Sequence, residues 1–388
     1  MCIGAWTLDH PNYALILCTN RDEFLNRPTQ NAHFHSFENE NDRQKPSSSS
    51  GSVLSGRDIQ AGGSWFGISR TGRVALLTNI TEPPQKLPSS RGYLVSSFLL
   101  SDSSHPLEDE VGKIVPQDAE FAGFNLLLLA PTPLPTSKVP LESENKEAQG
   151  PEAEPESAKA SGISRDEKLM YDAILVTNHG AGGILEARRL TSAERACGCI
   201  SNGIDGQGGN EWPKVKRANK DLGEVLKTLP TDGDSFAQTE SELIENLFHI
   251  LTWQSPEPVT QRSELRNTVH VAPMLHHVLF PSITKVPGTS RPDGLSASCS
   301  APLAANPNSD PQPEYPLPAS LSSQSYYGTR LSTVLLVRRD GSVLFIERDI
   351  WMLGKDGRPM RMDQQESRGE GDIKERVFTF KLTSVTIS

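Results

Sequence analysis

Short apolar runs of strand length recur along the whole chain. The longest are YALILCTN at 13–20, GSWFGISRTGRVALLTN at 63–79, FNLLLLA at 124–130, YDAILVTNHGAGGILEARRLT at 171–191, LSTVLLVRRDGSVLFIERD at 331–349 and RVFTFKLT at 376–383. Runs of this length and composition predict β-strands, and the pair Asp340-Gly341 predicts a tight turn between two of them. Uninterrupted apolar stretches such as LILC predict strands that are covered on both faces.

Two segments show helical spacing instead. WPKVKRANKDLGEVLKTLP at 212–230 places apolar residues three and four positions apart, with Pro213 near its start. SELIENLFHILTW at 241–253 has the same periodicity and begins with Ser241, which we expect to cap the helix. Strands in runs with a helix pair between them predict a layered α+β fold.

Three stretches have a composition that does not support a packed core. They cover about residues 36–52, 131–168 and 286–323, and they are rich in Pro, Ser, Glu and Gly. We expect them to be disordered insertions, because they hold too few large apolar groups to offset the entropy of ordering. No segment between them is long enough for a core of its own, so residues 1–388 are expected to form a single domain.

The net charge of −10 argues against a nucleic-acid partner, because phosphate binding requires clustered cations. No apolar run reaches the roughly 20 residues of a transmembrane helix, and no signal peptide is recognisable at the start. The cysteines are few and odd in number, which fits a reducing compartment. We therefore expect a cytoplasmic protein without a transmembrane segment. The cysteines are Cys2, Cys18, Cys197, Cys199 and Cys299.

A cysteine stands directly behind the initiator methionine. Removal of Met1 would leave Cys2 as the first residue, with a terminal amine whose ordinary pKa is about 7.7–8.0. One residue would then supply both the nucleophile and the general base. The alternative is that Cys2 is a small buried apolar residue at the start of the first strand.

Charged and amide residues crowd the end of the second apolar run, which continues as NRDEF. Arg21 can hold a thiolate or a substrate carboxylate, and Asp22 can orient a terminal ammonium. The alternative is an ion-pair cluster at a strand end, and for Glu23 and Arg27 we favour a structural or surface role. Adjacent residues of a strand point to opposite faces, so Arg21 and Asp22 cannot easily serve one site together.

A series of short motifs in this chain resembles one known family. MCI, NRDEFLNRP, AGGSWFGIS, ALLTN, GFNLLL, SNG before WPKV, and YGTRLSTVLLV occur in order and are similar to the transport-and-Golgi-organisation-2 family, whose defining region is the NRDE domain. The resemblance implies an N-terminal-nucleophile-hydrolase-like four-layer αββα sandwich. It also implies a role in Golgi and endoplasmic reticulum organisation and protein secretion, or in haem trafficking and lipid homeostasis, with association with the Golgi or mitochondria.

A more distant resemblance is to cysteine N-terminal-nucleophile hydrolases such as conjugated bile acid hydrolases. It implies a nucleophile, an Arg and an Asp after the second strand, an oxyanion-hole Asn, a second Asn and a late Arg. An amide donor aimed at a developing oxyanion suits such chemistry, although Asn beside a strand end or before Gly is also typical of turns. The matching residues are Cys2, Arg21, Asp22, Asn79, Asn202 and Arg330.

These observations leave an enzyme and a non-enzymatic protein as alternatives. We rank secretory-pathway organisation first, haem handling second and a cysteine-dependent amide hydrolase or acyltransferase third. The partners expected are organelle components of the secretory pathway, or haem as a carried ligand. No metal site is expected, because Cys197 and Cys199 form at best half of a tetrahedral set.

Overall fold

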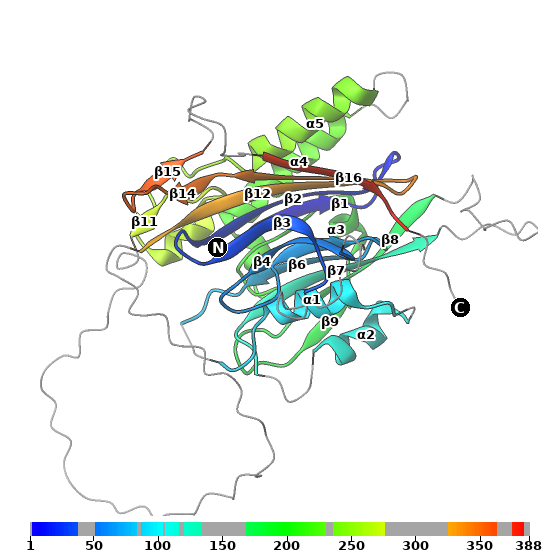
Figure 1. Ribbon diagram of the computed structural model, residues 1–388, viewed down its shortest axis with the longest axis horizontal. Coiled ribbons are helices and arrows are strands. Elements are labelled where there is room, and N and C mark those ends of the chain that lie inside the picture. Colours follow the sequence, from blue (N-terminus) through cyan, green and yellow to red (C-terminus); the bar gives the residue numbers. More distant parts are fainter. Residues whose placement is uncertain are drawn as a thin grey trace, which may run out of the picture.

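A computed structural model of the protein describes residues 2–37, 51–83, 87–103, 105–115, 120–133, 168–229, 236–275, 325–362 and 375–383. Two antiparallel sheets lie face to face in its centre, with helices on the outer face of each (Figure 1). The polypeptide therefore forms four layers, in the order helix, sheet, sheet, helix. This is the α+β sandwich that the resemblance predicted.

The first sheet has seven strands and contains both the start and the end of the described chain. Its order is β10-β1-β2-β12-β13-β16, and β11 pairs with β12. The long central strands β2 and β12 are almost wholly buried, because each is covered by the other sheet on one face and by helices on the other. The bounds are β1 Ile3–Thr7, β2 Tyr13–Phe24, β10 Gly198–Ile200, β11 Met274–Leu275, β12 Tyr326–Arg338, β13 Ser342–Asp349 and β16 Glu375–Lys381.

The second sheet also has seven strands, and they follow one another in chain order from β3 to β9. Consecutive strands pair antiparallel, so this sheet is an up-and-down meander. The bounds are β3 Thr29–His35, β4 Val53–Asp58, β5 Phe66–Ser69, β6 Val74–Asn79, β7 Phe124–Pro133, β8 Leu169–Thr177 and β9 Glu186–Arg189. A separate two-stranded ribbon joins β14 Trp351–Leu353 to β15 Pro359–Arg361.

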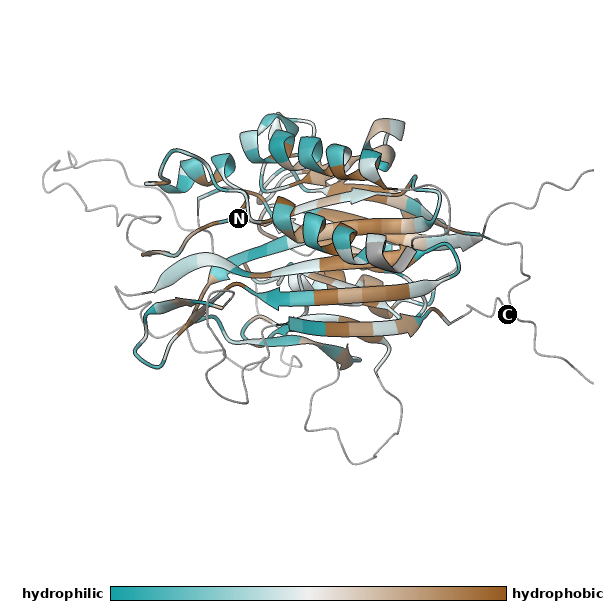
Figure 2. Ribbon diagram, turned by 90° about the horizontal axis from the view of Figure 1, so that it is seen from above, coloured by the Kyte–Doolittle hydropathy of each residue, from teal (hydrophilic) through white to brown (hydrophobic). Residues whose placement is uncertain are grey.

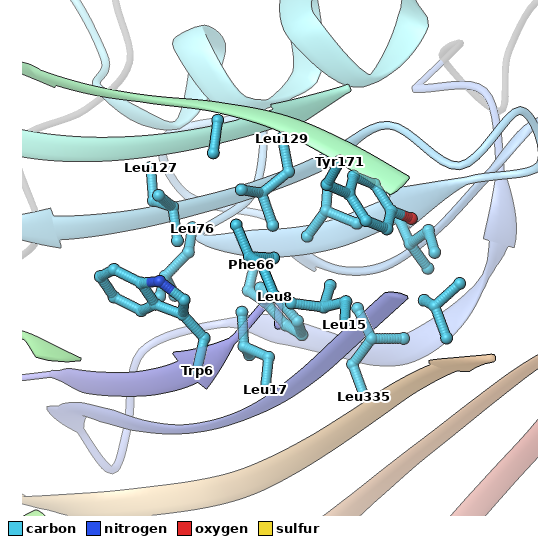
Figure 3. Packing of buried hydrophobic residues seen from close by; sticks show 14 of the residues in the cluster. Trp6, Leu8, Leu15, Leu17, Phe66, Leu76, Leu127, Leu129, Tyr171 and Leu335 are labelled. Carbon is cyan, nitrogen blue, oxygen red and sulfur yellow. The ribbon is translucent and has the colours of Figure 1, made fainter. Parts of the chain in front are cut away.

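Three apolar layers hold the sandwich together. The central one lies between the sheets and is built around Trp6, Leu17, Phe66, Leu76 and Leu127 (Figure 3). A second lies under α1 Gly92–Leu100 and α2 Leu107–Ile114, and a third under α4 Pro213–Thr228 and α5 Phe236–Ile250. Apolar residues gather in the middle of the strands, whereas the helices turn polar residues outward (Figure 2).

Most predicted strands are confirmed, and α4 begins at Pro213 as its sequence predicts. The cap assigned to Ser241 is wrong, because α5 starts at Phe236 and Ser241 lies inside it. The helices α1, α2 and α3 Ser192–Ala196 were not predicted from the sequence. The first of these begins at a glycine, which disfavours helices, and the other two have 8 and 5 residues.

The insertion predicted at 131–168 needs a correction at its start. Strand β7 runs through Pro133, where it pairs with Leu169 of β8. Pairing continues there because two long neighbouring strands extend beyond the core together. Residues 134–167 and the predicted insertion at 286–323 lie outside the described residues, as does most of the stretch at 36–52. Among the described residues, no helix is both long and apolar enough to cross a bilayer.

Candidate functional site

Cys2 lies immediately before β1, at one end of the sandwich. The register pairs Ile3 with Asn20, so Cys2 and Arg21 are the next neighbours along the β1–β2 ladder. The free thiol is half-buried, and its Sγ lies 4.0 Å from the carbonyl oxygen of Asp22. A half-buried thiol at a strand end is within reach of a ligand, unlike Cys18, which the core covers completely.

The NRDE residues alternate between the two faces of β2. Asn20 faces the helical layer, where its Nδ2 donates to the carbonyl oxygens of Leu251 at 2.9 Å and Val269 at 3.2 Å. Asp22 faces the same way, and its Oδ1 accepts a 2.6 Å hydrogen bond from Thr329. Asn20 therefore fixes the segment after α5 to the sheet, which is a structural role that the sequence did not reveal.

Arg21 faces the other way, into the space between the sheets. It is 4% exposed, its guanidinium lies 3.8 Å from the ring centre of Trp65, and its Nη1 donates to Thr29 Oγ1 at 3.3 Å. Nη1 of Arg330 donates to the same hydroxyl at 3.0 Å and to the Arg27 carbonyl oxygen at 2.6 Å. Burial lowers the pKa of Arg21, and burial together with the Arg21 charge lowers the pKa of Arg330 to about 10.

Asn202 and Asn79 meet where the loop after β10 crosses to the second sheet. Nδ2 of Asn202 donates to the backbone carbonyl oxygen of Asn79 at 2.6 Å, while the Asn79 residue itself is exposed at the end of β6. The neighbouring Ser201 Oγ lies 2.6 Å from the Cys2 carbonyl oxygen. This loop therefore links Cys2 on the first sheet to Asn79 on the second.

Lys214 is a site residue that the sequence reading missed. It is fully buried, and its Nζ lies 3.4 Å from Oδ1 of Asn202. Burial lowers its pKa to about 8, although Asp22, Cys2 and Cys199 favour the charged form. The sequence pattern of this segment predicts the helix start at Pro213 and carries no signal that its next residue is buried.

A hollow of about 310 Å³ lies beside the start of α1. Glycines 62 and 63, serines 89 and 90, Tyr93 and Phe121 line it. Arg91, which follows Ser90, is buried enough for its pKa to be lowered, and its charge acts on Cys2. The hollow is lined by small residues and two aromatic rings.

The structure brings the six predicted site residues to one end of the sandwich. Cys2, Arg21 and Arg330 are connected through the β1–β2 ladder and Thr29, and Asn202 and Asn79 through the loop after β10. The carboxylate of Asp22 lies on the opposite face of β2 from Arg21. Among the described residues, no group of three His, Cys, Asp or Glu side chains could hold a metal ion.

The layers define the class of protein: an α+β sandwich of two antiparallel seven-stranded sheets between two helical layers. A family model described as "Transport and Golgi organisation 2" matches residues 1–352. The chain therefore belongs to this family.

Relatives in other organisms carry the same description. The chain is 38% identical over 119 residues to the mouse "Transport and Golgi organization 2 homolog", and 36% identical over 119 residues to the human homolog. Each match covers 30% of this chain and only 38% of the relative. An uncharacterised protein of Saccharomyces cerevisiae is 26% identical over 407 residues, covering 98% of this chain and 100% of the yeast protein.

Among solved structures, a mutant conjugated bile acid hydrolase from Clostridium perfringens is similar at 9% identity, with a TM-score of 0.36. The match covers 99% of this chain and 97% of the hydrolase.

Proposed function

We propose that this protein acts in Golgi and endoplasmic reticulum organisation and protein secretion, and that it handles its ligand or substrate at the Cys2 site. The family description and the names of the mouse and human relatives support the cellular part. The observation that carries the molecular part is the convergence of Cys2, Arg21, Asn202 and Arg330 at one end of the sandwich. The few cysteines support action on the cytosolic side of the Golgi or mitochondria.

Rescue of cells that lack the protein tests this proposal. Wild-type protein should restore secretion of a reporter cargo and normal Golgi morphology, whereas Cys2→Ala at equal abundance should not. Cys197→Ala is the matched control, because that thiol is also half-buried but donates to Asn219 away from the site. Full rescue by Cys2→Ala would contradict the proposal.

Cysteine-dependent acyl chemistry is a second candidate function for the same site. The specific observation in its favour is the half-buried Cys2 thiol beside the buried Arg21 cation, with the Asn202 amide nearby. Nδ2 of Asn202 has two hydrogens and its bond to Asn79 uses one of them, which leaves a donor for an oxyanion. Attack of the Cys2 sulfur on an amide or ester would form a thioester and release the amine or alcohol, which takes up the thiol proton.

Single-turnover acylation distinguishes this candidate from simple binding. A simple ester such as p-nitrophenyl acetate should acylate the Cys2 peptide of the wild-type protein, and Asn202→Ala should slow that step about 100-fold. Absence of acylation at Cys2 would exclude the candidate and leave the cellular proposal intact. Haem carriage and lipid homeostasis stay predictions from the resemblance, because no contact in the described part of the chain favours either.

A further inference from the structure

Lys214 is buried at a place that is unfavourable for a cation in two ways. It lies in the first turn of α4, directly after Pro213, and its side chain is 0% exposed. Burial removes the hydration of an ammonium, and the N-terminal end of a helix carries a positive partial charge. Its surroundings must therefore compensate both effects.

The groups around Lys214 come from several elements at the site. Its Nζ lies 3.4 Å from Asn202 Oδ1 and 6.0 Å from the Trp212 ring centre. The titratable groups that act on it are Asp22 of β2, Cys2 before β1 and Cys199 of β10. Asp22 has the largest of the three effects in favour of the ammonium form, whereas burial raises the pKa of the Cys199 thiol and keeps it neutral.

Two routes connect Lys214 to Cys2. Asn202, whose Oδ1 faces the lysine, donates its Nδ2 to the Asn79 carbonyl oxygen at 2.6 Å. The same Oδ1 lies 3.1 Å from Ser201 Oγ, which lies 2.6 Å from the Cys2 carbonyl oxygen. The second route is the direct electrostatic interaction between the ammonium and the thiol.

We infer that Lys214 is a positioning residue of the Cys2 site: its buried ammonium fixes the orientation of the Asn202 amide and places a positive charge at the Cys2 end of the sandwich. Arg21, the next neighbour of Cys2 along the β1–β2 ladder, is a second buried cation at this end. The inference deepens the proposed function, because it assumes that Cys2 is the working group. The lowered pKa of Lys214, about 8, makes the lysine charge removable at moderate pH.

The rate of Cys2 alkylation by iodoacetamide tests the inference in the full chain. Peptide mass spectrometry would follow each cysteine separately from roughly pH 6 to pH 10. Lys214→Met should slow Cys2 alkylation at pH 7 about 10-fold. Lys214→Arg, which keeps its charge at every pH tested, should retain the wild-type rate at pH 7.

Lys216→Met is the matched control, since that lysine is exposed on the same helix and pairs with Glu211. It should leave the Cys2 profile unchanged, and Cys197 should serve as an internal reference in every variant.

Should Lys214→Met fail to fold, Lys214→Gln also removes the charge and keeps a donor for Asn202, and we expect the same slowing. Identical Cys2 profiles in wild type and the folded neutral variant would overturn the inference. This readout needs no turnover or rescue, so it stays separate from the test of the proposed function.

Discussion

Two regions of this protein bury cations, and the buried cations have different kinds of partner in the two regions. Under α1, Nη2 of Arg73 lies 2.6 Å from Glu110 Oε2, and its Nε donates to the Phe98 carbonyl oxygen. Ser101 donates to the other carboxylate oxygen of Glu110. Both charged groups in this region therefore have a partner of opposite sign or a polar partner.

The cations at the Cys2 end have weaker partners. Arg21 and Arg330 share the hydroxyl of Thr29, and in the described part of the chain neither lies within ion-pair distance of a carboxylate. Burial accordingly lowers the pKa of both. The difference suggests that charge under α1 serves stability, whereas charge at the Cys2 end is held for a ligand or for the thiol.

Breaking the ion pair under α1 should have the largest effect on stability. Glu110→Ala leaves the buried Arg73 without its carboxylate, so the free energy of unfolding should fall by about 3–5 kcal/mol. Denaturant titration measures this change. Glu108→Ala is the control, because its ion pair with Arg189 is largely exposed and should contribute less than about 1 kcal/mol. Equal losses in the two variants would remove the contrast between buried and exposed pairs.

The pH dependence of stability should reveal the buried Lys214. Its pKa falls from 10.5 in the unfolded chain to about 8 in the folded protein. Between these values the unfolded chain binds a proton that the folded chain does not, so the free energy of unfolding rises with pH. Relative to Lys214→Met, the wild-type protein should gain about 2–3 kcal/mol between pH 8 and pH 10.5. Below pH 8 the difference should be constant, and a flat difference throughout would show that the folded lysine titrates normally.

Arg21→Met should give the smallest change in stability. Loss of the stacking on Trp65 is offset by relief from burying the guanidinium, so the free energy of unfolding should change by no more than about 1 kcal/mol. Cys2 alkylation at neutral pH should nevertheless slow severalfold, because a neighbouring cation is lost. A stability loss as large as that of Glu110→Ala would place Arg21 with the structural cations instead.

Local pattern was enough to predict many of the elements. The apolar run of β2 predicted a strand covered on both faces, and residues 14–18 are 0% exposed. The Asp340-Gly341 turn formed as predicted, with Gly341 at a φ of 83° that favours glycine. The motif series predicted the family and the four layers. Patterns of this kind succeed because strand alternation and turn geometry depend on neighbours in sequence.

Tertiary structure decided the rest, because partners from distant segments set it. The backbone carbonyl oxygen of Asn79 accepts from Asn202, 123 positions away, and this contact is independent of the role that the resemblance implies for the Asn79 amide. The partner of Asn20 is the segment after α5, which local sequence around Asn20 does not reveal. Lys214 is buried because α4 packs against β10 and against β1, which is remote in sequence. The sequence alone determined which residue types are available at this end of the sandwich, and packing between remote segments determined which of them face the thiol.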